Sequence, residues 1–546
     1  MTNKEIASKF NLLGKIMELH GENAFKTKSY TNAYLTIRKL PDDLADMVEP
    51  EISALSGIGK AISAKITELL STGEIQTLNK YLDITPSGII QMLGIKGFGP
   101  KKIAVIWKEL EIETIGELLY AVNENRLVEL KGFGQKTQAA LKEQLEYYLE
   151  SSDKIHFATA EKYAKDIIEK LNKVFPEAQH QITGQVARKN NIIDCISLIT
   201  TSNDKSILEF VENDSIIEKY DDGMSIHNCT VEFLKVKPNE FHFELAKSSS
   251  DADFWETLNI EKDTYQNEAE VFTKNKFPYY IPEFREKENI PQKENYKSNI
   301  IEADMIKGCI HNHSVYSDGM NSIEEMIDAA ADEGYEYFVL TDHSKSAFYA
   351  NGLQEERLYK QLDEIRTVDQ NNPDIKLFSG IESDILSNGD LDYSDEILGE
   401  LDVVIASVHS NLKMDIDKAT TRLVRAIENP FTSILGHPTG RLLLSRKGYP
   451  LDFQKIIDAC AANDVAIELN ANPLRLDMDW TWIHYALEKD VLISINPDAH
   501  SIAGIKDIYY GVCSARKAAL PINSCLNAFD LEEFEEWLSE QHQKRG

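Results

Sequence analysis

The sequence predicts a multidomain protein with an all-α N-terminal region, an α+β middle and a C-terminal α/β barrel. A chain of 546 residues exceeds what one hydrophobic core usually organises. Residues 1–150 have apolar side chains at helical spacing and no convincing strand. From Ile306 onward, near-continuous apolar runs alternate with helical stretches. This alternation is typical of a buried parallel sheet, either open or closed.

Composition narrows the class of protein. A net charge of −32 argues against a protein that simply coats nucleic acid. Charge is nearly balanced over residues 1–150, so any contact with a phosphate backbone is expected there. The six cysteines are scattered without a CxxC pair, which favours neither a disulfide framework nor a zinc ribbon. No membrane-length apolar run and no signal-peptide pattern are present, so we expect a cytoplasmic protein with no membrane partner.

One unit recurs three times in the helical region, at residues 55–66, 95–106 and 130–141. Each has an apolar residue, then Gly-x-Gly, then a helix with lysine in its first turns. Backbone N–H groups that converge at a helix N-terminus bind anions, although glycines also simply end helices. The candidate phosphate-binding residues are Gly57, Gly59, Lys60, Gly97, Gly99, Lys101, Lys102, Gly132, Gly134 and Lys136.

The middle of the chain predicts an α+β domain. A helix is expected over residues 159–174, and three strand-like runs follow at 192–201, 229–236 and 241–247. The polar segment 281–300 contains two prolines and suits a linker.

Metal-type ligands close nearly every strand that we expect in the barrel; the sixth is the exception. In a strand, residues i and i+2 point to the same side, so His311 and His313 can reach one ion, as can Asp498 and His500. In a closed barrel, the C-terminal strand ends share one face. A single strand-end histidine is more often structural, but a whole set is not. The candidate ligands are His311, His313, Asp318, His343, Glu382, His409, His437, Asp498 and His500.

This set resembles the PHP (polymerase and histidinol phosphatase) domain, a distorted seven-stranded barrel with a trinuclear metal centre. The resemblance implies one ion on His311, His313, Glu382 and Asp498, a second on Glu382, His409 and His437, and a third on Asp318, His343 and His500. Imidazole and carboxylate ligands suit two or three ions of Mn, Zn or Fe. Such ions lower the pKa of a water and offset phosphate charge, which predicts phosphoester hydrolysis with His311, His313, Glu382, His409 and Asp498 as catalytic residues.

Two residues near these ligands have candidate supporting roles. Arg441, four residues after His437, is a candidate phosphate clamp, or else an ordinary surface arginine. Asp342 is expected to orient a neighbouring histidine or to form a salt bridge.

The order of parts extends the resemblance to the whole chain. The three Gly-x-Gly units resemble helix-hairpin-helix motifs, which hold DNA backbones without reading sequence. Residues 20–70 resemble the lyase domain of family X DNA polymerases, and residues 280–289 resemble the end of their thumb. The full architecture is similar to bacterial family X polymerases that carry a C-terminal PHP domain. It implies a lyase-like DNA-binding domain (1–85), a fingers-like region (86–152), a palm and thumb (153–285), a linker (286–302) and a PHP domain (303–546).

The palm departs from the family pattern. Two of the three carboxylates that hold Mg ions fall on Cys195 and Ser197, or on Asp194 and Ile196 after a shift of one residue. The third falls on Glu232. No register restores the pair that two-metal nucleotidyl transfer requires, so we expect a degenerate palm with little or no polymerase activity.

Two further residues match family positions in the lyase domain. Lys65 lies where the lyase nucleophile sits, although a phosphate-contacting or exposed lysine is the alternative. Tyr30 matches a DNA-contact position.

The resemblance implies a monomeric DNA-repair protein whose barrel acts as a 3′-5′ exonuclease on gapped, nicked or 3′-ended DNA, independently of sequence. Removal of 3′-phosphates and abasic-site cleavage are expected side activities. Two alternatives stay open: a small-molecule phosphatase of the histidinol-phosphate type, and a non-catalytic DNA-binding scaffold.

Overall fold

The computed structural model describes residues 1–545 except 39, 41–42, 56, 96–97, 129, 131–132, 151–153, 221–222 and 227–228. The chain forms two compact units. The smaller unit comprises Met1–Val122 and Leu127–Leu145, and the larger comprises Asn123–Arg126 and Glu146–Gly546. Within the described residues, no helix has both the length and the apolar character that a membrane crossing requires.

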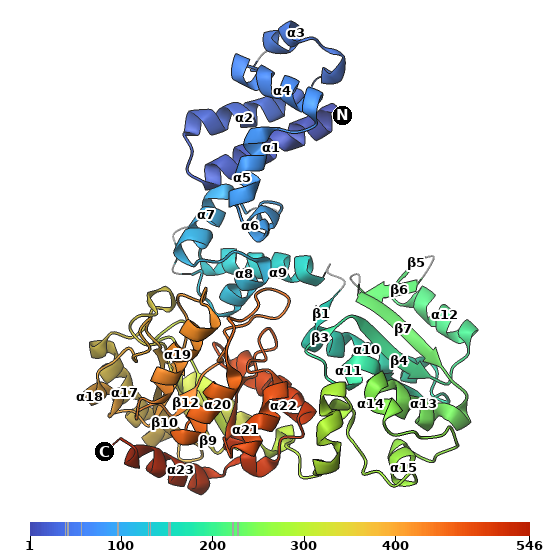
Figure 1. Cartoon of the computed structure of the whole chain (residues 1–546), viewed down its shortest axis with the longest axis vertical. Coiled ribbons are helices and arrows are strands. Elements are labelled where there is room, and N and C mark those ends of the chain that lie inside the picture. The colour runs from blue at the N-terminus through green and yellow to red at the C-terminus, as the bar shows by residue number, and fades with distance from the viewer. Residues whose placement is uncertain are drawn as a thin grey trace. The chain divides into compact units, whose positions relative to one another are not determined.

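Helices build the smaller unit, as the sequence predicts, with no strand among its described residues (Figure 1). The first helix begins at a capping box, in which Thr2 and Glu5 each satisfy the other's backbone N–H. Its residues Ile6, Phe10 and Leu13 are fully buried. The helices are α1 (Asn3–Leu19), α2 (Ala24–Ile37), α3 (Glu49–Ala54), α4 (Lys60–Thr72), α5 (Gln76–Ile84), α6 (Ser87–Met92), α7 (Pro100–Glu109), α8 (Ile115–Asn123) and α9 (Gln135–Glu150).

A five-stranded sheet organises the first part of the larger unit, in the order β2-β4-β7-β6-β5. Its strands are β2 (His180–Thr183), β4 (Cys195–Thr200), β5 (Glu218–Tyr220), β6 (Gly223–Ile226) and β7 (Cys229–Lys235). The central pair β4 and β7 is parallel, and the other pairs are antiparallel. Helices α10 (Phe157–Val174) and α12 (Asp204–Asn213) pack their apolar faces on this sheet. The predicted α+β character is therefore confirmed.

For one of the three strand-like runs, the prediction of a strand is wrong. Residues 241–247 form helix α13 (Phe241–Ser248), which the short 3₁₀ helix η2 (Pro238–Glu240) leads into. The alternating Phe241, Phe243 and Leu245 mimic a strand, but Phe241 and Leu245 also share one helical face and pack with Ile199. Phe243 and Ala246 pack in a different apolar cluster.

An aromatic cluster follows this sheet. Rings of Phe254, Phe272, Tyr280, Phe284 and Tyr296 pack together with centroid distances of 4.7–6.2 Å among neighbouring rings. The helices that carry or connect them are α14 (Ala252–Glu256), α15 (Glu268–Thr273), η3 (Pro282–Phe284) and η4 (Lys287–Asn295).

A seven-stranded parallel sheet forms the rest of the larger unit, in the order β14-β13-β12-β11-β10-β9-β8. All seven predicted strands are present: β8 (Gly308–Asn312), β9 (Tyr337–Leu340), β10 (Lys376–Asp384), β11 (Val403–Ser407), β12 (Ile434–Leu435), β13 (Ala466–Asn470) and β14 (Ile493–Asn496). A parallel bridge between Asn312 and Ala499 brings the two edges together, so the barrel nearly closes.

Helices surround this barrel (Figure 1). They are α16 (Ile323–Asp332), α17 (Glu355–Asn371), α18 (Asp395–Leu398), α19 (Ile416–Ile427), α20 (Phe453–Ala462), α21 (Ile483–Glu488), α22 (Ile508–Lys517) and α23 (Leu531–Gln543).

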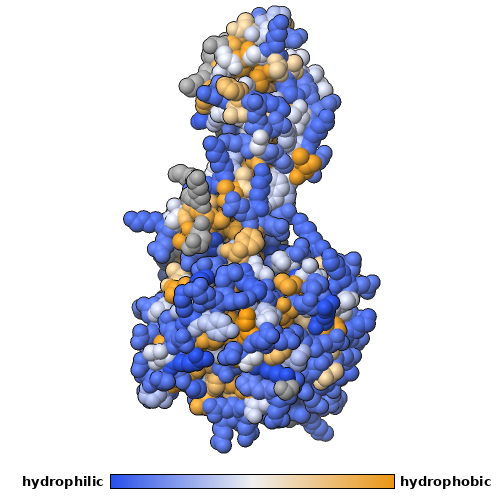
Figure 2. Space-filling view, turned by 90° about the vertical axis from the view of Figure 1, so that its left-hand side faces the viewer, coloured by the Kyte–Doolittle hydropathy of each residue, from blue (hydrophilic) through white to orange (hydrophobic). Residues whose placement is uncertain are grey.

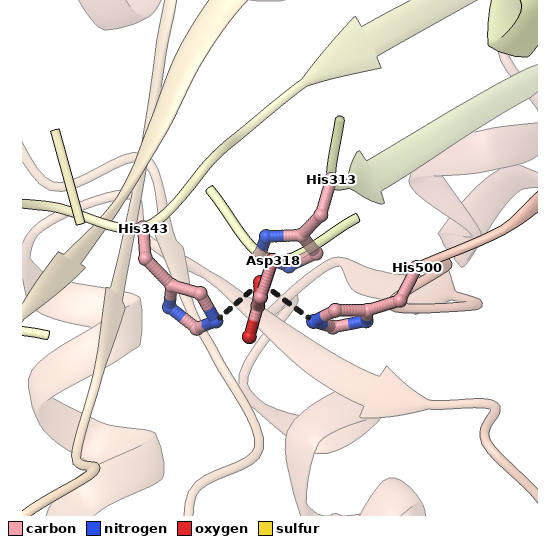
Figure 3. Close-up of side chains that lie close together, drawn as sticks. All are labelled: His313, Asp318, His343 and His500. Carbon is pink, nitrogen blue, oxygen red and sulfur yellow. Dashed lines mark ion pairs between the residues drawn. The ribbon is translucent and has the colours of Figure 1, made fainter. Parts of the chain in front are cut away.

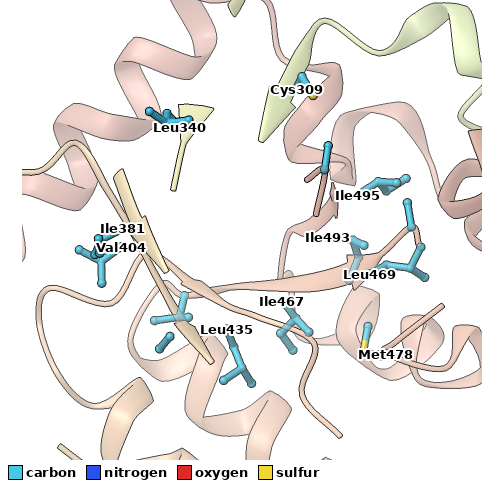
Figure 4. Close-up of a cluster of buried hydrophobic side chains, with 14 of the residues drawn as sticks. Cys309, Leu340, Ile381, Val404, Leu435, Ile467, Leu469, Met478, Ile493 and Ile495 are labelled. Atoms are coloured by element: carbon cyan, nitrogen blue, oxygen red, sulfur yellow. The ribbon is translucent and has the colours of Figure 1, made fainter. Parts of the chain in front are cut away.

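Alternate strand residues build two separate apolar clusters. One set, including Leu340, Val404 and Ile467, packs against the surrounding helices (Figure 4). The other set, including Val339 and Ile405, packs with Phe534 and Trp537 of α23. Because successive side chains of a strand point to opposite faces, the second set fills the barrel interior.

One face of the molecule is largely polar. Figure 2 shows a face on which hydrophilic side chains predominate and hydrophobic ones lie in small scattered groups. This agrees with a chain of net charge −32.

Candidate metal centre

The interior-facing set of strand residues changes from apolar to polar toward the C-terminal strand ends. On β11 the set runs Val403, Ile405, Ser407 and then His409. On β14 the same spacing runs from Ser494 to Asp498 and His500. The strands therefore deliver their ligand-type side chains to one mouth of the barrel.

Backbone strain marks the same mouth. His311 has φ of 67° and Asp498 has φ of 53°. This left-handed region costs energy for a residue with a side chain and is concentrated at functional sites. The surrounding barrel holds both residues in place, since both are buried.

Glu382 occupies the middle of the cluster. Its Oε1 lies 2.8 Å from His437 Nε2, 3.0 Å from His409 Nε2 and 3.4 Å from His311 Nε2. Its Oε2 lies 2.8 Å from His343 Nδ1. One buried carboxylate is thus within reach of four imidazoles from four different strand ends.

Asp318 is the second meeting point. Its Oδ1 lies 3.3 Å from His500 Nε2 and 3.6 Å from His343 Nε2, with His313 beside them (Figure 3). Asp498 Oδ1 lies 3.0 Å from His313 Nε2. The structure thus brings together all nine residues that the sequence singled out.

The grouping differs in part from the one that the resemblance implies. His313, Asp318, His343 and His500 form one set whose ligand atoms lie within 4.8 Å of one another. The three expected members of the third site are therefore together, and His313 joins them. His313 also groups with His311 and Glu382, as the first site implies.

The unsatisfied atoms of this cluster fit divalent cations. Among the described residues, His311 Nε2, His313 Nδ1, Asp318 Oδ2, Glu382 Oε2 and His500 Nε2 are buried without a hydrogen-bond partner. Buried polar atoms without partners are costly and uncommon. Bound ions would satisfy these atoms, and the mixture of nitrogen and carboxylate oxygen suits Mn, Zn or Fe.

The histidines and carboxylates also set each other's protonation. Burial, together with His500 and His343, lowers the pKa of His313 to about 3. Burial favours a neutral His409 ring too, but Glu382 and Asp384 raise its pKa to about 9. Burial would favour a protonated Glu382, but the adjacent histidines hold its pKa well below its usual range. The carboxylate is therefore ionised and available to a cation at neutral pH.

Glu468, which the sequence analysis missed, supports this cluster from the sixth strand, β13. Its Oε2 lies 2.6 Å from His311 Nδ1, and its Oε1 accepts a hydrogen bond of 3.2 Å from the His437 backbone N–H. A carboxylate behind a metal-binding imidazole fixes the orientation of the ring and raises its basicity. Asp384 has the same relation to His409 Nδ1, at 3.0 Å. The alternation on β13 placed Glu468 on the interior face, which was the available signal.

A second missed group comes from far earlier in the chain. Segment Asn123–Arg126 belongs to the larger unit, and the buried Glu124 Oε2 lies 2.9 Å from His500 Nε2. Arg126 Nε lies 3.6 Å from Asp318 Oδ2. No strand pattern surrounds these residues, so nothing in the sequence linked them to the barrel.

Arg441 and Asp342 are both engaged in holding loops. Arg441 pairs with Asp479 at 2.7 Å and donates to the carbonyl oxygens of Arg475 and Leu476. Its half-buried guanidinium thus anchors a neighbouring loop, which favours a structural role over a phosphate clamp and differs from the ordinary surface arginine given as the alternative. Asp342 accepts hydrogen bonds from the backbone N–H groups of Ser314 (2.8 Å) and Ser317 (3.1 Å), and has no histidine partner among the residues that the structure describes.

The Gly-x-Gly units lie where helices begin. Gly59, Gly99 and Gly134 directly precede α4, α7 and α9, and Gly57 has φ of 84°, which favours glycine. Lys60, Lys101 and Lys136 are exposed in the first turns of these helices, and Lys102 is half-buried. Gly97 and Gly132 lie outside the described residues.

Tyr30 and Lys65, the two residues that the family resemblance assigned to a lyase-like domain, are buried and half-buried respectively. Lys65, on α4, pairs with Glu68 at 3.4 Å. Tyr30 is buried and stacks on Phe10 with ring centroids 6.1 Å apart. This packing favours a structural role for Tyr30 over the predicted DNA contact.

The palm carries one carboxylate at the three expected positions. Ser197 on β4 lies directly opposite Glu232 on β7, and Cys195 lies two residues before Ser197. Burial raises the pKa of the Cys195 thiol to about 11, so it stays protonated at neutral pH and is a poor metal ligand. Asp194 pairs instead with Lys154 at 3.0 Å, and Ile196 is fully buried. A cavity of about 460 Å³ lies over this surface.

Fold and buried ligand cluster together define a PHP-type barrel joined to helical DNA-binding modules, and comparison with known families agrees. The PHP domain family matches residues 310–472. A helix-hairpin-helix domain matches residues 1–75, and a SAM-like helix-hairpin-helix tandem matches residues 89–146.

One relative covers nearly the whole chain. The sequence is 31% identical to the DNA polymerase/3′-5′ exonuclease PolX of Bacillus subtilis (strain 168), over 98% of this chain and 99% of that protein. The chain therefore belongs to the bacterial family X DNA polymerases with a C-terminal PHP domain. A second relative, from Thermoanaerobacter sp. (strain X514), is named "Probable phosphatase" and is 25% identical over 43% of this chain and 96% of its own length.

Proposed function

We propose that this protein is a DNA-repair enzyme that binds DNA through its helix-hairpin-helix modules and hydrolyses phosphoester bonds from the 3′ end in its barrel. The observation that carries the proposal is the meeting of nine ligand-type side chains, eight of them from buried residues, at one barrel mouth. The name of the Bacillus subtilis relative, which includes 3′-5′ exonuclease, supports this substrate and direction. Gapped, nicked or 3′-ended DNA of any sequence is the proposed substrate, and a cytoplasmic monomer is the proposed form.

The side chains at the barrel mouth have two roles in this proposal: some bind metal ions, and others orient the ligands. Two or three divalent ions of Mn, Zn or Fe, when bound, supply Lewis acidity and a water of lowered pKa. Glu382 and Asp318 are the central carboxylates, and the histidines around them complete the ligand set. Glu468 and Asp384 hold His311 and His409 in the orientation that ligation needs.

We further propose that the palm positions DNA without extending it. Cys195 and Ser197 offer no carboxylate, and the single Glu232 is too little for two-metal nucleotidyl transfer. A primer extension assay with Mg or Mn tests this point, and robust templated synthesis would overturn it.

The main experiment incubates end-labelled gapped, nicked and single-stranded DNA with Mn, with and without a chelator. Hydrolysis should depend on the metal and should disappear in His311→Ala, while DNA binding stays nearly unchanged. His542→Ala is the matched control, because His542 is an exposed histidine on α23 of the same domain. Full nuclease activity in His311→Ala would refute the proposed site.

A phosphatase is the second candidate, because the Thermoanaerobacter relative carries that name. Removal of a terminal phosphate and cleavage of a terminal nucleotide need the same ion cluster. Two substrates assayed side by side distinguish a DNA-acting enzyme from a small-molecule phosphatase. One is DNA that ends in a 3′-phosphate, and the other is a small phosphomonoester. Rapid turnover of the small phosphomonoester with no action on DNA would favour the small-molecule phosphatase.

A further inference from the structure

The loop between β9 and α17, residues 345–352, lies at the mouth of the barrel and is anchored along its length. Ser346 N–H donates to Asp392 at 2.6 Å, and Gly352 N–H donates to the carbonyl oxygen of Ala347 at 2.9 Å. Asn351 Nδ2 donates to the carbonyl oxygen of Ser317 at 3.2 Å. We call these residues the mouth loop. Its anchors fix the backbone, which is what a preorganised recognition element requires.

Tyr349 of the mouth loop points its ring toward the ligand cluster. The ring centroid lies 6.4 Å from that of His343 and 6.5 Å from that of His409, and the Arg126 guanidinium lies 5.0 Å from its centre. Its hydroxyl oxygen is buried without a hydrogen-bond partner among the described residues. A tyrosine hydroxyl keeps its proton at neutral pH and can therefore donate a hydrogen bond. An unsatisfied donor beside a phosphoesterase centre calls for an acceptor that substrate brings.

Phe348, the preceding residue, faces outward. Its side chain is 80% exposed, and its ring centroid lies 5.8 Å from that of Tyr349. A large apolar ring held in water on an anchored loop is a ready surface for a flat apolar partner. Nucleobases stack on aromatic rings in a way that tolerates any sequence.

We propose that the mouth loop recognises the terminal nucleotide: Phe348 stacks on its base while the Tyr349 hydroxyl donates a hydrogen bond to its phosphate. This inference rests on the proposed function and narrows it, because it makes the substrate a base-bearing nucleotide and not any phosphoester. Phe348 then contacts the face of the base, and Tyr349 contacts the charged phosphate of the same nucleotide.

Two matched single-stranded oligonucleotides test the inference, one ending in an ordinary 3′ nucleotide and the other in an abasic residue. The wild-type protein with Mn should prefer the base-bearing end roughly tenfold through a lower KM, the scale of one stacked base. Phe348→Ala and Phe348→Leu should remove that preference, since leucine keeps apolar character but has no flat face. Tyr349→Phe should lower kcat/KM for both substrates alike, because both carry the phosphate. Tyr359→Phe, at a half-exposed tyrosine of α17, should change neither substrate.

A second measurement avoids turnover. With a chelator present, a fluorescent adenine analogue at the 3′ end should be quenched on binding to wild-type protein and not on binding to Phe348→Ala. An unchanged base preference and unchanged quenching in both Phe348 variants would overturn the inference while leaving nuclease activity intact. Absence of DNA hydrolysis by the wild-type protein would instead refute the proposed function, and the inference with it.

Discussion

The palm and the barrel belong to one compact unit, but they differ in the residues at strand positions that could hold metal ions. Both place ligand positions on parallel strands, where residues i and i+2 share a face. In the palm those positions hold Cys195, Ser197 and Glu232, with a single carboxylate. In the barrel they hold histidines whose ring nitrogens lie 2.8–3.6 Å from the carboxylate oxygens of Glu382 and Asp318. The strands of the palm thus form with a single carboxylate at these positions, whereas metal binding requires several charged or ligating side chains.

The largest difference between the barrel and the palm is expected when one glutamate in each is replaced by glutamine. Glu382→Gln removes the carboxylate that four histidines approach, so DNA hydrolysis should fall more than a hundredfold. Glu232→Gln in the palm should leave hydrolysis unchanged. Nuclease rates of the two purified variants with Mn decide the matter, and equal losses would contradict the assignment of chemistry to the barrel.

A smaller loss is expected when only the support behind a ligand changes. Glu468→Gln keeps the size of the side chain but weakens its hold on His311 Nδ1, so metal affinity should fall roughly 10- to 100-fold. Competition with a chelator of known affinity measures this. Glu488→Gln, at an exposed position on α21, is the control. Unaltered affinity in Glu468→Gln would show that Glu468 serves folding alone.

The pH dependence of metal affinity tests the role of His409 and should give a smaller effect. In metal-free protein the raised pKa of His409, about 9, keeps the ring protonated at pH 7, and a bound ion must displace that proton. Apparent affinity should therefore rise by up to roughly tenfold per pH unit for each proton released, and this gain should end as the pH passes about 9. Calorimetric metal titrations in buffers of different ionisation enthalpy count the protons. Release that does not decline above pH 9 would contradict the role of His409.

Arg441 should give the smallest effect on rate. Arg441→Ala removes its contacts to Asp479 and two backbone carbonyls, which should lower the free energy of unfolding by roughly 1–3 kcal/mol. The rate of hydrolysis should change by less than about threefold. Thermal unfolding and nuclease assays on the same sample give both values. A large loss of rate at unchanged stability would restore the phosphate-clamp prediction.

Local pattern was enough to predict much of this protein from its sequence. Strand periodicity and terminal ligands predicted all seven barrel strands and the same-side pairing of His311 with His313. The recurring Gly-x-Gly units predicted three helix starts. Periodicity failed at residues 241–247, because three alternating apolar residues fit a strand and a helix equally well.

Only the tertiary structure decided what each polar group meets. Glu468 was visible as an interior strand residue, but its pairing with His311 joins positions 157 residues apart. Glu124 beside His500, and the unsatisfied Tyr349 hydroxyl beside two candidate ligands, likewise depend on contacts between distant segments. Sequence spacing determines which side of an element a side chain faces, because the backbone repeat is local. The partner on that side is set by how whole elements pack, and that information is spread over the chain.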